Sequence, residues 1–189
     1  MLIVAIWLWC AGVRPVIFRQ IRSGKDGKPF TIYKFCSMTN ERDAEGNLLP
    51  DEKRLTRVGA FLRKMSLDEL PQFFNVLIGN MTFVGPRPLL MEYNDLYSPE
   101  HALRLTVKPG ITGLTQVNGR STLTWKQRCD MDVVYVKNAS FWLDQKIIFR
   151  TVFNVLAAKD SLPVQSNIEA IDDLGLLKRS AEKRKQKKG

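Results

Sequence analysis

The chain begins with a continuous apolar run and continues through alternating strand-type and helix-type patterns. Residues 1–13 (MLIVAIWLWCAGV) would form a helix roughly 20 Å long, which is short of the ~30 Å hydrocarbon core of a bilayer. No positively charged region precedes this run, as a signal peptide would require. Trp7 and Trp9 suit an interfacial or re-entrant membrane segment, whereas a buried core helix explains the run equally well. A third alternative is that the chain begins partway through a longer membrane element.

Two short segments with strand-type patterns follow and predict a β-hairpin. Residues 16–21 and 30–35 are rich in β-branched and aromatic side chains. The segment between them, residues 23–29, contains two glycines and a proline and predicts the turn. Residues 39–53 are mostly polar and predict a surface loop.

Apolar side chains at helical spacing dominate the rest of the chain. Residues 83–88 contain two prolines and a glycine and predict a rigid loop. Residues 108–120 are rich in glycine and predict a loop with a short strand at 115–117. Helices are predicted at residues 55–65, 67–78, 99–105, 124–136 and 141–158. The last of these has a wide apolar face, which suits either the membrane interface or ordinary core packing.

These elements predict an α+β fold class, a helix-rich single domain with a small β-hairpin or sheet. We expect it to associate with a membrane through a re-entrant type of N-terminal segment and through amphipathic helices. The expected organisation is a partial membrane-dipping segment at residues 1–13, a folded domain at 14–160 and a tail at 161–189. This tail is polar to polybasic and too charged to pack, so we expect it to be largely disordered.

Net charge changes these predictions little, because most of the excess positive charge lies in the tail. The chain carries 29 Lys and Arg against 19 Asp and Glu, a formal net charge of +10. Residues 178–189 hold seven basic residues and one acid and contribute +6, which leaves +4 for the other 177 residues. A basic tail is a weak argument for nucleic acid, so we expect no nucleic acid partner. Three scattered cysteines without a CxxC pair suit a reducing compartment.

Two adjacent carboxylates, Asp68 and Glu69, follow two cations in the segment RKMSLDELPQ. One interpretation is structural, because Ser66 and Glu69 match a capping box and Asp68 would then be a favourable charge at the helix N-terminus. Pro71 argues against Ser66 as the N-cap, since it would then fall inside the helix and remove a backbone hydrogen bond. It fits better if Asp68 is the N-cap.

The second interpretation of the two carboxylates is functional. A carboxylate can attack phosphorus to form an acyl phosphate, and two adjacent carboxylates can hold Mg²⁺. Phosphate chemistry also needs nearby cations, and the chain offers Lys34, Arg63 and Arg87. Arg87 stands between two prolines, which would present its guanidinium rigidly to a phosphate. Pairing of Arg87 with a core carboxylate is the structural alternative.

Six motifs in a fixed order resemble the bacterial sugar transferase family, the monotopic phosphoglycosyl transferases. No single motif is specific, but their order and spacing over about residues 16–156 are. The motifs are SLDELPQ (66–72), FNVLxGxM (74–81), FVGPRP (83–88), KPGITG (108–113), QVNGR (116–120) and DxxYV (132–136).

The resemblance implies an enzyme that moves a sugar phosphate from a UDP-sugar onto undecaprenyl phosphate and releases UMP, the first membrane step of glycan biosynthesis. Asp68 would be the nucleophile that forms a covalent sugar-phosphate intermediate. Glu69 would be its partner, aiding Mg²⁺ binding and deprotonation, and both carboxylates would bind the metal. The phosphate and nucleotide site would be lined by Lys34, Arg63, Arg87, Asp132 and Arg120. For Asp132, a surface helix charge is the structural alternative.

The resemblance also implies a monotopic protein at the cytoplasmic face of the bacterial inner membrane, with downstream glycosyltransferases as candidate partners. Near anionic lipid, the tail would add roughly 1 kcal/mol of attraction per cation. Residues 1–13 resemble only the returning half of the family's re-entrant helix. We therefore expect a misassigned start, a truncated chain or a weaker anchor. The alternative function is a truncated, catalytically impaired membrane-surface scaffold of the same fold. No residue discriminates among donor sugars.

Overall fold

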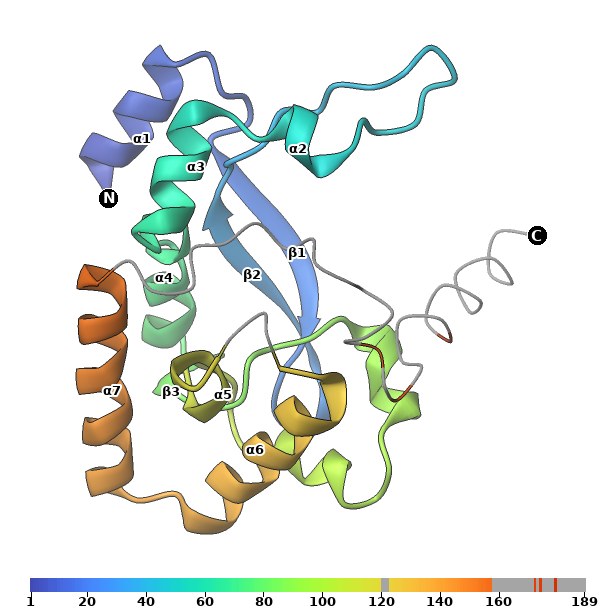
Figure 1. Cartoon of the computed structure of the whole chain (residues 1–189), viewed down its shortest axis with the longest axis vertical. Coiled ribbons are helices and arrows are strands. Elements are labelled where there is room, and N and C mark those ends of the chain that lie inside the picture. The colour runs from blue at the N-terminus through green and yellow to red at the C-terminus, as the bar shows by residue number, and fades with distance from the viewer. Residues whose placement is uncertain (120–122, 158–171, 173, 175–178, 180–189) are drawn as a thin grey trace.

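The computed structural model describes residues 1–119, 123–157, 172, 174 and 179. A β-hairpin runs through the middle of the molecule (Figure 1). Helices along one side of it are α1 (Leu2–Cys10), α3 (Arg57–Lys64), α4 (Gln72–Leu77) and α7 (Phe141–Leu156). The predicted combination of helices with a small sheet is confirmed. Most of the predicted tail, with its expected disorder, lies outside the described residues.

The hairpin pairs β1 (Ile17–Ser23) with β2 (Pro29–Phe35) in antiparallel register, from Ile17 opposite Phe35 to Ser23 opposite Pro29. The short 3₁₀ turn η1 (Lys25–Gly27) joins them at the place where the sequence predicts a turn. Alternation along β2 buries Phe30 and Ile32, which form a core cluster with Met81. The predicted hairpin is therefore confirmed.

Helix α1 packs on α3 and on the end of the hairpin. Leu8 and Leu62 are fully buried beside Phe35, and the rings of Trp7 and Phe61 meet edge to face with their centroids 5.6 Å apart. Within the described residues, no helix combines the length and apolar character needed to cross a membrane. A short helix, α2 (Asp51–Arg54), precedes α3 after the polar loop.

The predicted helix over residues 67–78 is wrong as a continuous element. It is divided into a 3₁₀ turn, η2 (Leu67–Glu69), and the short helix α4. Ser66 adopts a left-handed backbone conformation with φ 53° and its side chain makes no cap hydrogen bond, so the Ser66 capping box is also wrong. Asp68 is not an N-cap either, because it lies inside η2 and the N-cap of α4 is Pro71. Ser66 lies between α3 and η2, and Leu70 and Pro71 lie between η2 and α4.

A second small sheet pairs β3 (Thr82–Val84) in parallel with β4 (Gly110–Thr112). The predicted rigid loop at 83–88 therefore begins inside a strand. The strand predicted at 115–117 is wrong, because those residues lie in the helix α5 (Leu114–Val117). There Val117 is buried with Tyr135 and Ile147, so packing against two helices decides the conformation.

The remaining helices close the lower part of the molecule (Figure 1). A complete capping box of Thr124 and Gln127 starts α6, and Ser140 caps the first turn of α7. These two helices confirm the predictions for 124–136 and 141–158, whereas the predicted helix at 99–105 is a 3₁₀ segment. The elements of this part are η3 (Met91–Leu96), η4 (His101–Leu105) and α6 (Trp125–Asn138).

Candidate active site

Glu69 lies at the centre of a cluster of opposite charges. Its Oε1 atom accepts hydrogen bonds from Lys34 Nζ and from Arg87 Nη2, each at 2.8 Å. Burial alone would raise the pKa of Glu69, but the charges and hydrogen bonds of Arg87 and Lys34 outweigh burial and hold this pKa well below its ordinary value. Glu69 is therefore a carboxylate across the whole physiological pH range.

Asp68, the neighbouring carboxylate, has the opposite shift. Burial raises the pKa of Asp68 and the negative charge of Glu69 raises it further, against the attraction of Lys34, Arg63 and Arg87. Two adjacent carboxyl groups with pKa values moved apart have different chemical roles, as is common in active sites. Asp68 is therefore the more basic carboxylate of the pair, and its predicted role as nucleophile stays a prediction.

The turn that carries both carboxylates is fixed by its backbone. Ser66 has a positive φ although it is not glycine, a conformation that costs of order 1–3 kcal/mol and clusters at functional sites. The Glu69 amide donates to the Ser66 carbonyl at 3.3 Å, which closes the 3₁₀ turn. This geometry sets Asp68 and Glu69 between α3 and α4 rather than on the body of a helix.

Lys34 reaches Glu69 because Asn75 fixes α4 against β2. The Asn75 side chain is fully buried, accepts from the Tyr33 amide at 3.2 Å and donates to the Thr31 carbonyl at 2.7 Å. Both backbone groups belong to the strand that carries Lys34. Asn75 lies within the motif FNVLxGxM, but helical periodicity does not identify its role in joining α4 to β2.

Arg63 approaches the site from the last turn of α3. Its Nε donates to Ser37 Oγ at 2.8 Å, and its charge lowers the pKa of Asp68. Gly59 permits this contact, because a Cβ atom at Gly59 would lie 1.9 Å from the Ser37 carbonyl oxygen. The close approach of α3 to residue 37 therefore requires glycine.

Arg87 stands on a loop that is held at several points. The Gly85 amide donates to the Thr112 carbonyl at 2.9 Å, and the Gly110 amide donates to the Pro86 carbonyl at 3.0 Å. The Arg87 carbonyl accepts from Arg104 Nη2 at 2.8 Å. These bonds hold the Arg87 backbone, and the Arg87 guanidinium pairs with the carboxylate of Glu69, a pairing of the kind that the structural alternative expected. The predicted contact of Arg87 with a phosphate stays a prediction.

Asp132 lies in α6 and is not in direct contact with the two carboxylates. It is buried, with Oδ2 accepting from Arg104 and Oδ1 accepting from Thr115 Oγ1 at 2.8 Å. Asp132 is therefore not a surface helix charge, so this structural alternative is wrong. The predicted contact of Asp132 with substrate stays a prediction. Arg120 lies outside the described residues, so its predicted role also stays a prediction.

Arg104 is the residue of this region that the sequence did not single out. It lies in a 3₁₀ segment without periodic pattern, and a lone arginine in a polar stretch gives no signal of burial. His101, in the same segment, pairs with Asp130 at 2.9 Å and makes no contact with the carboxylate pair.

The pair Asp68 and Glu69 is suited to Mg²⁺, which binds few protein carboxylates and completes its shell with water and substrate phosphate oxygens. No group of three or more His, Cys, Asp or Glu side chains gathers into a metal centre in the described part of the chain. A cleft of about 560 Å³ elsewhere, between β3, residues 106–108 and the start of α7, does not include either carboxylate. Mg²⁺ binding stays a prediction.

Comparisons with known proteins show which family the chain belongs to. The family described as "Bacterial sugar transferase" matches residues 1–158 of this chain. The chain belongs to the bacterial sugar transferase family. This match confirms the resemblance seen in the six motifs. As a bacterial sugar transferase, the protein is an enzyme of the transferase class.

Individual relatives within the bacterial sugar transferase family show the same likeness. An uncharacterized sugar transferase of Bacillus subtilis (strain 168), EpsL, is 57% identical over 145 residues, which cover 77% of this chain and 72% of that protein. A UDP-glucose:undecaprenyl-phosphate glucose-1-phosphate transferase of Klebsiella pneumoniae is 47% identical over 163 residues. The undecaprenyl-phosphate galactose phosphotransferase of Salmonella typhimurium (strain LT2) is 40% identical over 171 residues. This chain spans 35% and 36% of those two proteins.

Proposed function

We propose that this protein transfers a sugar phosphate from a UDP-sugar to undecaprenyl phosphate and releases UMP. The observation that carries the proposal is the pair of adjacent carboxylates with separated pKa values, one of them bound to two cations. Relatives whose names specify undecaprenyl phosphate as acceptor use glucose or galactose donors, so UDP-glucose and UDP-galactose are the first donors to test.

The proposed reaction has two steps at Asp68. An ionised Asp68 oxygen attacks the phosphorus that bears the sugar, the bond from that phosphorus to the bridging oxygen breaks, and UMP leaves with the electron pair. A phosphate oxygen of undecaprenyl phosphate then attacks the same phosphorus. The acyl-phosphate bond breaks, which gives undecaprenyl diphospho-sugar and regenerates the Asp68 carboxylate.

Lys34 and Arg87 would neutralise the negative charge that accumulates on the transferring phosphoryl group. Glu69 holds both cations beside Asp68. A carboxylate with so low a pKa is a weak base, which favours a role for Glu69 in placing cations and metal over the proton acceptance that the resemblance also implies. Asp68 and Glu69 would hold Mg²⁺, which when bound supplies further neutralisation of the diphosphate.

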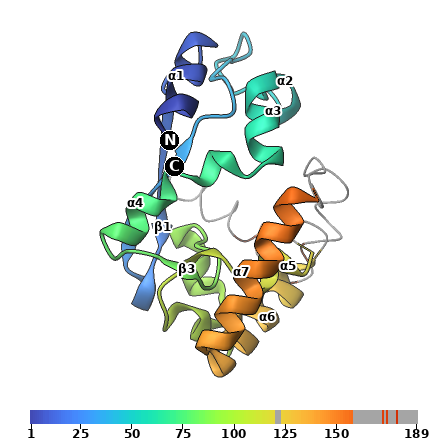
Figure 2. The same ribbon diagram turned by 90° about the vertical axis from the view of Figure 1, so that its left-hand side faces the viewer.

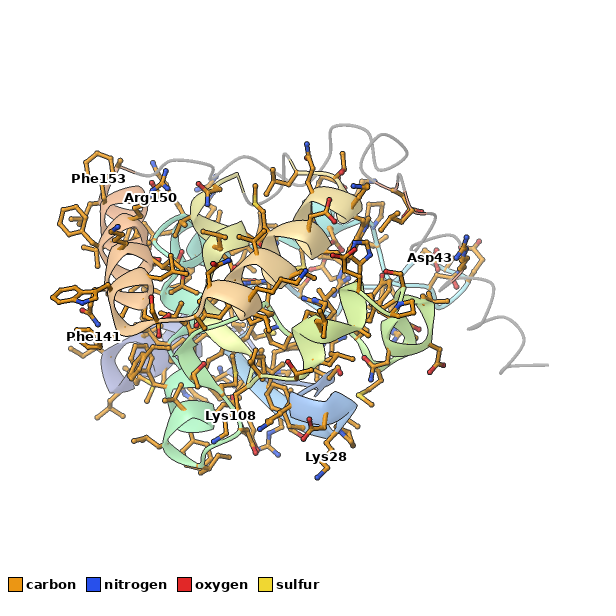
Figure 3. The ribbon with its side chains drawn as sticks, turned by 90° about the horizontal axis from the view of Figure 1, so that it is seen from below. Lys28, Asp43, Lys108, Phe141, Arg150 and Phe153 are labelled. Carbon is orange, nitrogen blue, oxygen red and sulfur yellow. The ribbon has the colours of Figure 1, made fainter. Side chains whose placement is uncertain are left out.

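An exposed hydrophobic surface supports attachment to the cytoplasmic leaflet of the inner membrane. Helices α1, α4 and α7 lie on the same side of the molecule, which Figure 2 shows face-on. Phe141 and Phe153 extend outward from α7 in Figure 3. We define the apolar face by the apolar side chains of these three helices that are at least 60% exposed: Leu2, Ile3, Trp9, Leu77, Phe141, Trp142, Phe149 and Leu156.

Large exposed apolar surfaces mark interaction sites, because soluble monomers rarely expose large apolar patches. Phe73 and Phe74, a few residues after Glu69, are also substantially exposed. In this proposal the apolar face would bring the carboxylate pair to the level of a lipid phosphate. In this proposal residues 1–13 are the membrane-dipping segment, residues 14–160 the catalytic domain and residues 161–189 a tail near the lipid surface.

The covalent step tests the proposal directly. We expect wild-type protein, incubated with UDP-glucose or UDP-galactose and no lipid acceptor, to gain the mass of one hexose phosphate and to release one equivalent of UMP. Asp68→Ala should gain no mass and release no UMP, whereas Asp43→Ala, which changes an aspartate of the distant polar loop, should match wild type. An adduct on Asp68→Ala would contradict the mechanism. Binding to lipid vesicles without any Asp68-dependent UMP release would instead support the scaffold alternative.

A further inference from the structure

Arg104 is buried at the meeting point of three segments, and none of its contacts is with the carboxylate pair. Its side chain and that of Asp132 are each only 4% exposed. Nε and Nη2 of Arg104 donate to Asp132 Oδ2 at 3.0 and 2.8 Å, and Nη1 donates to the Tyr97 hydroxyl at 2.6 Å. Burial raises the pKa of Tyr97 to about 12, so this hydroxyl is neutral and serves as an acceptor.

The remaining contact of Arg104 leads to the site. Nη2 also donates to the carbonyl of Arg87 at 2.8 Å, and the Arg87 side chain in turn donates to Glu69. One planar guanidinium therefore joins α6, the segment before η4 and the Arg87 loop, a geometry that a lysine ammonium cannot reproduce. Thr115 fixes the other oxygen of Asp132, so the anchor of Arg104 is itself held.

We propose that Arg104, anchored by Asp132, is a positioning residue. It fixes the Arg87 backbone so that the Arg87 guanidinium can donate its hydrogen bond to Glu69. The inference rests on the proposed function only for its kinetic consequence, because the geometric consequence is measurable without substrate. A displaced Arg87 would leave Glu69 with Lys34 of β2 as its close cation and with Asp68 as its neighbouring anion.

The substrate-free test measures the NMR order parameter of the Arg87 backbone amide in the full chain. Wild type should give the value of rigid backbone, about 0.85, and Arg104→Lys should lower it below about 0.6, because the Arg87 carbonyl loses its planar donor. Tyr97→Phe is the matched control, since it removes the Nη1 partner and leaves the bonds to Asp132 and Arg87. In Tyr97→Phe the Arg87 order parameter should be that of wild type. If Arg104→Lys does not fold, Asp132→Asn replaces it and should show the same fall.

A double-mutant cycle on UMP release gives the kinetic arm. Arg104→Lys should lower the rate about tenfold or more, the scale of one lost charge-assisted hydrogen bond. The same change should have little further effect in an Arg87→Ala background. An unchanged Arg87 order parameter in a folded Arg104 or Asp132 variant, or an equal fall in Tyr97→Phe, would overturn the proposal. Absence of UMP release by wild type would defeat the proposed function, while the order parameter still decides the positioning role.

Discussion

At the scale of single residues, the candidate site depends on how two neighbouring carboxylates come to differ. Glu69 receives two cations on one oxygen, while Asp68 receives their attraction only at a distance and also the repulsion of Glu69. The sequence allows these partners to be named, because Arg87 lies in the FVGPRP motif and Lys34 lies near the end of the predicted strand at residues 30–35. It does not show that both bind the same oxygen, which depends on how the hairpin and the Arg87 loop meet.

Glu69→Gln should move the acid limb of UMP release to lower pH. The negative charge of Glu69 raises the pKa of Asp68, so its removal lowers that pKa. In the proposed mechanism activity needs ionised Asp68 and is lost as pH falls through its pKa, so the limb should shift to lower pH. The maximal rate should also fall, because Lys34 and Arg87 lose their anchor. The pH–rate profile of Glu45→Gln, an exposed loop variant, should match wild type, and an upward shift in Glu69→Gln would contradict the argument.

At the scale of elements, local patterns predict the hairpin and the helices α3, α6 and α7, and they fail where tertiary contacts decide. The sequence predicts the break at residue 66, but it does not predict that residues 67–78 divide into the 3₁₀ turn η2 and the helix α4, because helical periodicity alone does not indicate that division. The segment 115–117 looks like a strand by composition, but Val117 packs into the helical core. Local sequence patterns also give no signal that Arg104 is buried against Asp132, because burial of this charge depends on a partner 28 residues away.

The anchor of α4 gives a test at this scale. Asn75→Leu should reduce the free energy of unfolding by about 2–4 kcal/mol, because it leaves the Tyr33 amide and the Thr31 carbonyl without their partner. Urea denaturation measures this change. Asn138→Leu, at the exposed end of α6, should stay within about 0.5 kcal/mol of wild type. Equal stability of the two variants would show that Asn75 does not fix α4.

At the scale of the whole molecule, helices α1, α4 and α7 carry exposed apolar side chains on one side. Membership of the bacterial sugar transferase family and the names of relatives make a lipid phosphate the proposed acceptor. A lipid phosphate stays at the headgroup level, so in the proposed function the protein would bring its site to the membrane surface rather than extract the lipid. The exposed side chains of α1, α4 and α7 would provide the area for that attachment.

Charges placed on the apolar face should weaken attachment. We expect Leu77→Glu and Phe149→Glu each to lower the affinity for anionic phospholipid vesicles about tenfold, because each loses buried apolar area and adds repulsion. Leu48→Glu, an exposed leucine in the polar loop, is the matched control and should bind as wild type does. Vesicle co-sedimentation measures all three. Equal loss in Leu48→Glu would mean that net charge, rather than this face, governs attachment.

The contact from Arg104 to Arg87 also affects the order in which the parts of the candidate site form during folding. Lys34 and Glu69 are 35 residues apart, and Asp132 lies 28 residues beyond Arg104. During synthesis the hairpin and the turn with both carboxylates leave the ribosome well before α6 does. Loop closure over such separations is slow compared with local helix formation. A nascent chain that has not yet exposed Asp132 therefore carries Asp68 and Glu69 before the anchor of Arg104 exists, and in the proposed function catalytic activity would be among the last properties that the folding chain acquires.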